Sequence, residues 1–341
     1  MQLSVIDISE PEDQILQPLL DAAANQGFLL VDGHNFTQKE VDELYATSEE
    51  FFTTVSHEEK MKYAIDSRNV GYTDFNNENL DARKGRDYKE AYNFCQINFV
   101  TGALNQNFNR SKNKFEPASA DCMPAYFKKR EIVVQNIVKK LHANAREIMR
   151  LLSLAMGVED ARFFVDQFDP EKPSPATFRL LHYPLIRNDN KAIHGDPNIR
   201  AGAHTDYGAL TLLFQRQGEQ GLQLLLDGEN WMDVDFVPSI HQGFAPPLVV
   251  NFGDLLSYWT NGILKSTIHR VKFCPGENRD SDRYSIVFFV DPENTTKLLP
   301  VPSKLVREKQ TREKEPVITS LEHLQKRLAE TYENMPDSVT A

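Results

Sequence analysis

The chain has 341 residues, and its 38 Lys and Arg against 49 Asp and Glu give a formal net charge of −11. A hydrophobic fraction of 40% and a charged fraction of 26% are typical of a globular chain and exclude a fibrous or largely disordered one. The acidic balance disfavours nucleic-acid binding, because a phosphate backbone repels a negatively charged surface.

Two further features bear on location. No stretch approaches the roughly 20 apolar residues that a membrane span needs, and the acidic start of the chain lacks the basic and apolar regions of a signal peptide. The cysteines Cys95, Cys122 and Cys274 are widely spaced and form no CxxC pair, which argues against a disulfide framework and against a thiolate zinc site. We therefore expect a cytoplasmic protein with neither a membrane nor a nucleic-acid partner.

The first third of the chain alternates short strands and helices. Apolar periodicity predicts strands at 3–7 and 28–31, helices at 15–23 and 57–63, and a helix after Thr37, which can form a capping box with Glu40. Residues 66–120 show few periodic runs and many turn formers, so we expect irregular structure there with one strand at 91–94.

The sequence pattern changes twice in the remainder of the chain. Apolar positions recur at helical spacing from 124 to 156, which predicts one long supporting helix that a single break could interrupt. From 170 to 291, short runs rich in Val, Ile, Leu, Phe and Tyr are separated by Pro, Gly, Asn and Asp, a pattern typical of an antiparallel sandwich or barrel. A last polar helix is predicted at 320–332.

The β-rich part contains His204, Asp206 and, far downstream, His269. If His204 and Asp206 lie on or at the end of a strand, the two-residue period points both side chains to one face. Two imidazoles and one carboxylate on one face leave three positions of an octahedral ion open, as in the non-haem Fe(II) oxygenases. A His-x-Asp pair alone is common on protein surfaces, so the neighbouring residues decide the interpretation.

A second group of residues follows the distal histidine. After a turn at 274–278, the run Arg283-Tyr284-Ser285 predicts a strand that pairs antiparallel beside the strand bearing His269, with Arg283 and Ser285 on one face. An arginine inside such a core is costly unless an anion meets it. A dicarboxylate bound by the guanidinium and the hydroxyl would supply that anion.

These motifs resemble those of the iron and 2-oxoglutarate-dependent dioxygenases of the isopenicillin N synthase-like superfamily, which combine His-x-Asp, a distal His and Arg-x-Ser. The likeness extends from about residue 3 to residue 332. It includes these segments: Gly27-Phe-Leu-Leu-Val, Glu50-Phe-Phe, Gly71-Tyr72, Asp87-Tyr-Lys89-Glu90, Gly221-Leu-Gln223, residues 247–256, Trp259-Thr-Asn-Gly262 and Ser266 to Val271.

The resemblance implies a role for each matching residue. His204, Asp206 and His269 would ligate Fe(II), and no catalytic residue beyond these ligands is implied. Arg283 and Ser285 would hold the distal carboxylate of 2-oxoglutarate. Tyr183 matches a family tyrosine that contacts the same carboxylate, whereas Leu181 stands where plant relatives usually have Asn, so one hydrogen bond to the co-substrate would be missing.

The resemblance also implies an α+β fold with a mainly β core: a distorted double-stranded β-helix, or jelly roll, flanked by helices that include the long supporting helix. The expected organisation is an N-terminal α/β region at 1–120, the supporting helix at 121–169, the jelly-roll core at 170–300 and a C-terminal extension with a helix at 301–341.

The implied function is an Fe(II)- and 2-oxoglutarate-dependent dioxygenase that hydroxylates or desaturates a small organic molecule and releases succinate and CO₂. It would use O₂, with ascorbate as a candidate for keeping the iron reduced, and would act as a monomer or weak homo-oligomer. Two alternatives stay open. One is a 2-oxoglutarate-independent oxidase of the isopenicillin N synthase or aminocyclopropane-carboxylate oxidase type, and the other is a non-catalytic iron-binding jelly-roll sensor.

Residues that would contact the primary substrate are expected in the 66–120 region, the 186–200 loop and the C-terminal helix. This expectation rests on analogy with the fold. Candidates in the first of these are Asn76, Asn77, Asn79 and Arg83. His182 neighbours Tyr183 but should point to the opposite strand face, so we assign it a structural or surface position.

Overall fold

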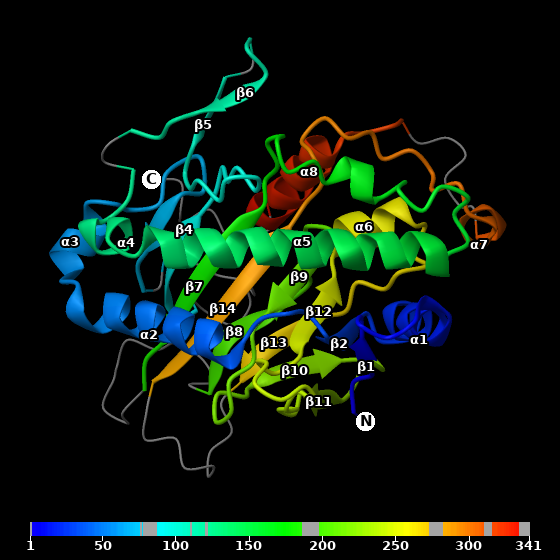
Figure 1. Cartoon of the computed structure of the whole chain (residues 1–341), viewed down its shortest axis with the longest axis horizontal. Coiled ribbons are helices and arrows are strands. Elements are labelled where there is room, and N and C mark those ends of the chain that lie inside the picture. The colour runs from blue at the N-terminus through cyan, green and yellow to red at the C-terminus, as the bar shows by residue number, and fades with distance from the viewer. Residues whose placement is uncertain are drawn as a thin grey trace.

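Two facing β-sheets form the centre of the structure, a computed structural model that describes residues 2–75, 77, 87–109, 111–119, 122–185, 198–272, 282–309 and 316–333 (Figure 1). The larger sheet contains β1 (Val5–Asp7), β2 (Phe28–Asp32), β3 (Gly71–Thr73), β4 (Glu90–Phe94), β7 (Thr177–Tyr183), β9 (Leu210–Leu213), β12 (Leu248–Phe252) and β14 (Arg283–Val290). Their spatial order is β1-β2-β12-β9-β14-β7-β4-β3. All neighbours pair antiparallel except β1 and β2.

The smaller sheet has the order β11-β10-β13-β8 and carries the two histidines of the candidate metal site. Its strands are β8 (Ile199–His204), β10 (Leu222–Leu225), β11 (Trp231–Asp233) and β13 (His269–Lys272). Apolar side chains from both sheets meet between them: Ala201 and Val271 of the smaller sheet pack with Leu181 and Val287 of the larger. A separate hairpin joins β5 (Asn107–Asn109) to β6 (Lys114–Glu116).

The helices α1 (Glu12–Asn25), α2 (Gln38–Thr54) and α5 (Glu131–Ala155) pack against strands of the larger sheet. The other helices of the described chain are α3 (His57–Met61), α4 (Ala125–Lys128), the 3-10 helix η1 (Val165–Gln167), α6 (Asp254–Trp259), α7 (Lys304–Glu308) and α8 (Ser320–Glu333). The long α5 crosses the sheet, and α1 and α2 pack beside it (Figure 1). None of these helices in the described part of the chain is long and apolar enough to cross a membrane.

Several helix predictions are confirmed. Thr37 caps α2 with a capping box: the backbone N of Glu40 donates to Thr37 Oγ1 at 3.2 Å, and the backbone N of Thr37 donates to Glu40 Oε2 at 2.9 Å. The long helix is interrupted once, because α4 ends at Lys128 and α5 begins at Glu131. The predicted polar helix at 320–332 is α8, which begins at Ser320 and ends at Glu333.

The prediction of irregular structure with one strand at 66–120 is wrong in part. Besides β4, this region forms β3, β5 and β6, each only 3 residues long. A strand of three residues is too short to show the alternation of apolar and polar side chains by which strands are recognised. These strands form through their partners instead: β3 pairs with β4, and β5 pairs with β6 across their own turn.

The predicted pairing of the His269 and Arg283 strands is also wrong. His269 begins β13, which pairs with β10 and β8, whereas Arg283 begins β14, which pairs with β7 and β9 in the other sheet. Strands that follow one another along the chain here lie in opposite sheets of the sandwich. His269 and Arg283 therefore approach the interior from two sides.

The face of α5 that packs on the sheet dominates the outer core. Its side chains at helical spacing are buried, among them Ile137, Leu141, Ile148 and Leu152, while Ile132 remains 61% exposed. Such burial stabilises a helix mainly through the apolar area removed from water.

We expect Leu152→Ala to lower the free energy of unfolding by about 2–5 kcal/mol, because it removes a fully buried side chain and leaves a cavity. Ile132→Ala on the same helix is the control and should change stability by less than about 0.5 kcal/mol. Urea unfolding of both variants checks this, and equal losses would contradict the assigned packing face.

Candidate metal centre and co-substrate site

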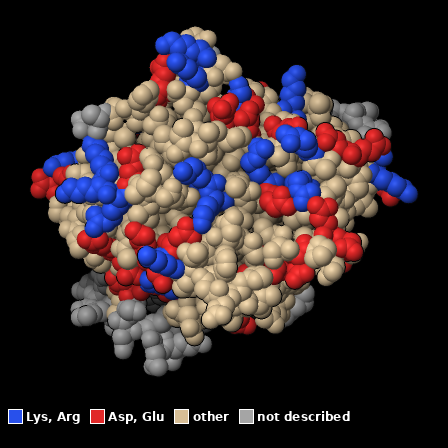
Figure 2. Space-filling model, in the orientation of Figure 1, with Lys and Arg blue, Asp and Glu red and all other residues tan. Residues whose placement is uncertain are grey.

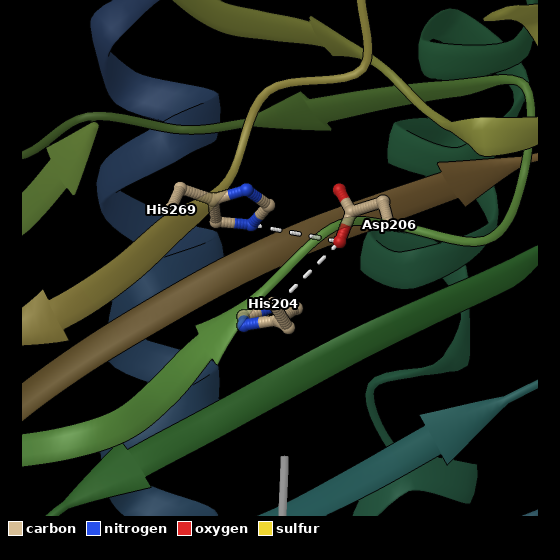
Figure 3. A group of neighbouring side chains, drawn as sticks. All are labelled: His204, Asp206 and His269. Atoms are coloured by element: carbon tan, nitrogen blue, oxygen red, sulfur yellow. Dashed lines mark ion pairs between the residues drawn. The ribbon is translucent and has the colours of Figure 1, made fainter. Parts of the chain in front are cut away.

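His204, Asp206 and His269 lie together at one end of the smaller sheet (Figure 3). His204 ends β8, Asp206 follows two residues later, and His269 begins β13. Asp206 Oδ1 lies 3.7 Å from His204 Nε2 and 3.6 Å from His269 Nε2. One ligand atom from each residue falls within 4.8 Å of the others, so the three can share one metal ion.

The pairing of β8 with β13 explains why the two histidines meet. His204 and His269 are direct partners in the antiparallel register, and their rings lie 4.3 Å apart between centroids. The register shifts between this pair and the next, Ala201 with Val271, so two residues of β8 oppose one of β13. This is a β-bulge, a feature that commonly re-aims side chains beside functional sites.

Both imidazoles are held so that the same nitrogen faces the centre. His204 Nδ1 lies 2.8 Å from the Gly202 carbonyl oxygen, and His269 Nδ1 lies 3.1 Å from the Thr267 carbonyl oxygen. A carbonyl only accepts, so each Nδ1 carries the proton and each Nε2 keeps its lone pair for a metal.

The two carboxylate oxygens of Asp206 have different partners. Its Oδ2 accepts hydrogen bonds from Thr211 Oγ1 at 2.6 Å and from Asn251 Nδ2 at 2.7 Å. Its Oδ1 is the atom that faces the two Nε2 atoms. The donor set of two nitrogens and one carboxylate oxygen fits Fe(II) with open positions for co-substrate and O₂.

The protonation states suit metal binding. Burial and the neighbouring His269 lower the pKa of His204 to about 4, so its imidazole is neutral near pH 7. Burial alone would raise the pKa of Asp206, but the two imidazoles and the hydrogen bonds from Asn251 and Thr211 outweigh it and lower the pKa below the usual value. His204 thus offers a neutral nitrogen and Asp206 an anionic oxygen.

A fourth titratable side chain, Asp291, lies directly after β14 and is only 6% exposed. Its Oδ1 accepts a hydrogen bond from the backbone N of Ala209 at 3.2 Å. Burial, with repulsion from Asp206 adding to it, raises the pKa of Asp291 to about 7. Sequence reasoning missed this residue, since nothing local distinguishes it from an ordinary acid at a strand end.

Arg283 approaches from the larger sheet and is 6% exposed. Its Nε donates to the Glu219 carbonyl oxygen at 2.7 Å, and its guanidinium lies 5.0 Å from the centroid of the Tyr183 ring. Its Nη1 is buried and has no hydrogen-bond partner in the part of the chain that the structure describes. Among the described residues no carboxylate lies within ion-pair distance of it. An unmet donor on a buried cation suits an anionic ligand such as the distal carboxylate of 2-oxoglutarate.

The other residues expected at this subsite lie on β14 and on its partner β7. Tyr183 is the register partner of Arg283, and Ser285 is the partner of Leu181. All of these side chains are buried. Leu181 packs with Ala201 and Val287 between the sheets, so an apolar contact stands where plant relatives usually have an amide.

His182 points to the opposite face, as expected, but it is buried. Its Nδ1 lies 2.7 Å from Glu90 Oε1 and its Nε2 lies 2.9 Å from Asp282 Oδ2. Asp282 directly precedes Arg283, so this pair of contacts ties β4 and β7 to the start of β14.

Most candidates for substrate contact lie outside the described residues: Asn76, Asn79, Arg83 and residues 186–197. Asn77 is exposed, and its backbone N donates to the Asp74 carbonyl oxygen at 3.4 Å. The third expected segment, α8, is linked to the metal centre through Asp254. Arg327 of α8 pairs with Asp254 at 2.7 Å, and Asp254 also accepts from the hydroxyl of Thr205, which lies between two candidate ligands.

Comparisons with known proteins agree with this geometry. The family model of the 2OG-Fe(II) oxygenase superfamily matches residues 175–292, and the model of the non-haem dioxygenase N-terminal region in morphine synthesis matches residues 3–112. A 2-oxoglutarate-Fe(II) type oxidoreductase of Emericella nidulans is 30% identical over 300 residues, which cover 84% of this chain and 77% of the relative. The chain belongs to the 2OG-Fe(II) oxygenase superfamily.

Other members of the superfamily show the same relationship. A homoarginine-6-hydroxylase of Oryza sativa is 27% identical over 84% of this chain and 80% of its own length. A Neurospora crassa protein solved in complex with alpha-KG has a TM-score of 0.74 and 26% identity, with 97% of this chain and 96% of that one covered. The predicted jelly-roll fold is confirmed, and so is the requirement for Fe(II), 2-oxoglutarate and O₂ that defines this superfamily of oxidoreductases.

The residues that hold Asp206 were missed from the sequence. Asn251 is a polar residue within a fully buried apolar strand, and that mismatch is the one signal that could have revealed it. Thr211 sits opposite it in the register of β9 and β12.

We expect Asn251→Leu to weaken Fe(II) or Co(II) binding about 10- to 100-fold, because Asp206 Oδ2 loses a donor and the carboxylate can rotate. Calorimetric titration of the metal-free protein measures this. Thr260→Val, which removes a buried hydroxyl that donates to the Leu256 carbonyl, is the control and should leave the affinity unchanged. Unchanged affinity in Asn251→Leu would show that the orientation of Asp206 does not depend on this bond.

Asp291 predicts a pH-dependent loss of stability. The pKa of its carboxyl is about 7 in the folded chain, against an ordinary value of 3.8. As the pH rises from about 4 to 7, the unfolded chain therefore loses this proton before the folded chain does. The free energy of unfolding falls over that pH range. Asp291→Asn removes this cost. Its stability relative to the wild type should therefore rise by roughly 2–3 kcal/mol between pH 5 and pH 8. Urea unfolding of metal-free protein tests this, and a difference independent of pH would refute the assignment.

Proposed function

We propose that His204, Asp206 and His269 bind the catalytic Fe(II) of this dioxygenase, and that Arg283, Ser285 and Tyr183 hold the distal carboxylate of 2-oxoglutarate. The observation that carries the metal assignment is the free Oδ1 of Asp206, which faces two imidazole Nε2 atoms while Oδ2 is held elsewhere. The buried, unpartnered Nη1 of Arg283 supports the co-substrate assignment.

The side chains supply geometry and charge. When bound, Fe(II) and 2-oxoglutarate would supply, with O₂ as the oxidant, the chemistry that releases succinate and CO₂ and oxidises a C–H bond. His204 offers a neutral imidazole, Asp206 provides one negative charge, and Arg283 neutralises the distal carboxylate of the co-substrate from the other sheet. Burial on both sides strengthens these electrostatic contacts by excluding water.

The substrate in this proposal is a small organic molecule that is hydroxylated or desaturated. The names of relatives support this class: one hydroxylates homoarginine, and the Neurospora crassa protein has also been solved with alpha-KG and thymine. Acidic and basic side chains are interspersed over the visible face of the surface (Figure 2), which supports a small-molecule substrate over a nucleic acid.

We place the enzyme in the cytoplasm, as a monomer or weak homo-oligomer without a membrane partner, on the support of its dispersed cysteines and net charge of −11. The division of the chain at 1–120, 121–169, 170–300 and 301–341 remains part of the proposal.

The oxidase and sensor alternatives have weaker support. Relatives of named activity that match most of this chain are 2-oxoglutarate-dependent enzymes and hydroxylases. A 1-aminocyclopropane-1-carboxylate oxidase of Solanum lycopersicum is 34% identical, but the match covers 52% of this chain and 50% of the relative. The 2-oxoglutarate-dependent activity is therefore the function that we propose.

Arg283→Ala should raise the KM for 2-oxoglutarate at least about 30-fold, equivalent to about 2 kcal/mol, because the carboxylate loses its cation. Succinate formation at varied 2-oxoglutarate is the measurement. Arg68→Ala, at an exposed arginine paired with Asp66, is the matched control and should behave as wild type. Asp206→Ala should give no turnover. An unchanged KM in Arg283→Ala would remove Arg283 from the co-substrate site.

A further inference from the structure

We propose that Asp87, held by Lys89, is a positioning residue for the iron ligand His204 and acts through the peptide of Gly202. The inference rests on the proposed function, because it assumes that His204 binds the metal. It assigns a task to a buried ion pair that neither ligates the metal nor belongs to the expected 2-oxoglutarate contacts.

A short chain of contacts joins Asp87 to His204. Asp87 Oδ1 accepts a hydrogen bond from the backbone N of Gly202 at 3.1 Å, across 115 positions of sequence. The carbonyl oxygen of Gly202 accepts the Nδ1 proton of His204 at 2.8 Å. The Gly202 residue is thus fixed at its N–H by Asp87 and uses its C=O to orient the imidazole.

The local backbone explains why this support is needed. Gly202 lies in the bulge of β8, where two residues oppose one of β13, and a bulge leaves its extra residue outside the regular ladder. β8 is also the last strand of the smaller sheet, so no further strand of that sheet, among the described residues, supports its other side. Asp87 comes from the segment directly before β4 of the larger sheet and therefore bridges the two sheets at this point.

The ion pair itself is deeply buried. Lys89 Nζ lies 2.6 Å from Asp87 Oδ2, and the two side chains are only 4% and 5% exposed. Replacing such a pair with apolar residues often leaves stability unchanged or improves it, so stability alone is a weak reason for its presence. With Oδ2 held by Lys89, Oδ1 is fixed toward Gly202, much as Asn251 and Thr211 fix the carboxylate of Asp206.

The Asp87 contact also affects the tautomer in which His204 would bind the metal. A hydrogen bond to an ionised acceptor is stronger and shorter than a neutral one, and linked hydrogen bonds polarise each other. The Gly202 carbonyl becomes a better acceptor, which holds His204 in the tautomer that presents Nε2 to the metal. Loss of the Asp87 contact should reduce metal affinity, whereas loss of its charge alone should matter less.

The test compares two double variants of equal charge. Asp87→Leu/Lys89→Met removes both charges and the acceptor, and Asp87→Asn/Lys89→Met removes both charges but keeps an oxygen that can accept from Gly202. We measure the Kd of Co(II) for each metal-free protein and the visible absorption spectrum of the Co(II)-saturated protein. Asp87→Leu/Lys89→Met, the leucine pair, should bind Co(II) about 10- to 100-fold more weakly than wild type and show an altered spectrum. For Asp87→Asn/Lys89→Met, the asparagine pair, the Kd should stay within about 3-fold of the wild-type value.

The control is Lys140→Met/Glu40→Gln, which neutralises an ion pair between α5 and α2, where Lys140 Nζ lies 2.6 Å from Glu40 Oε1. Its Co(II) affinity should match wild type even where stability falls. Should the leucine pair not fold, Asp87→Ser/Lys89→Met, whose hydroxyl is too short to reach Gly202, replaces it.

Two results would overturn the inference: wild-type affinity and spectrum in the leucine pair, or equal weakening in the leucine and asparagine pairs. Failure of the wild-type protein to bind Co(II) would instead refute the proposed function.

Discussion

The proposed site depends on the fixed orientation of the Asp206 carboxylate, whose two oxygens have different partners. One oxygen is held by Thr211 and Asn251, and only because of this does the other face two imidazole nitrogens at 3.6 and 3.7 Å. In the proposed centre, two imidazole nitrogens and one carboxylate oxygen, each fixed through the second polar atom of its side chain, would receive a divalent ion without rearrangement. The remaining features of the centre either maintain this geometry or supply the co-substrate.

The sandwich assembles the centre from both of its sheets. The smaller sheet contributes His204 and His269, and the larger contributes Arg283, Ser285 and Tyr183. Contacts between the sheets therefore determine how far the proposed iron ligands lie from Arg283, the proposed partner of the co-substrate carboxylate. The start of β4 and the residues just before it contact both sheets: Asp87 reaches Gly202 in the smaller sheet, while Glu90 holds His182, which reaches Asp282 directly before β14.

Much of this could be predicted from the sequence, and the failures have physical causes. The spacing of His204 and Asp206 and the apolar period of α5 are local signals, so they predicted a metal set and a supporting helix. Pairing is not local: the turn after His269 says nothing about whether the next strand joins the same sheet or crosses to the other. The contact of Asp87 with Gly202 spans 115 residues, and the raised pKa of Asp291 depends on burial, so neither leaves a sequence signal.

An anaerobic titration of Fe(II)-loaded protein with 2-oxoglutarate is the decisive measurement for the proposed centre. Chelation of the iron by the co-substrate gives a weak charge-transfer band in the visible range, which can appear only if the metal, the open positions and the anion subsite coexist. We predict a saturable band with one 2-oxoglutarate bound per iron. Iron that is bound but gives no band at saturating 2-oxoglutarate would contradict this assignment of the site.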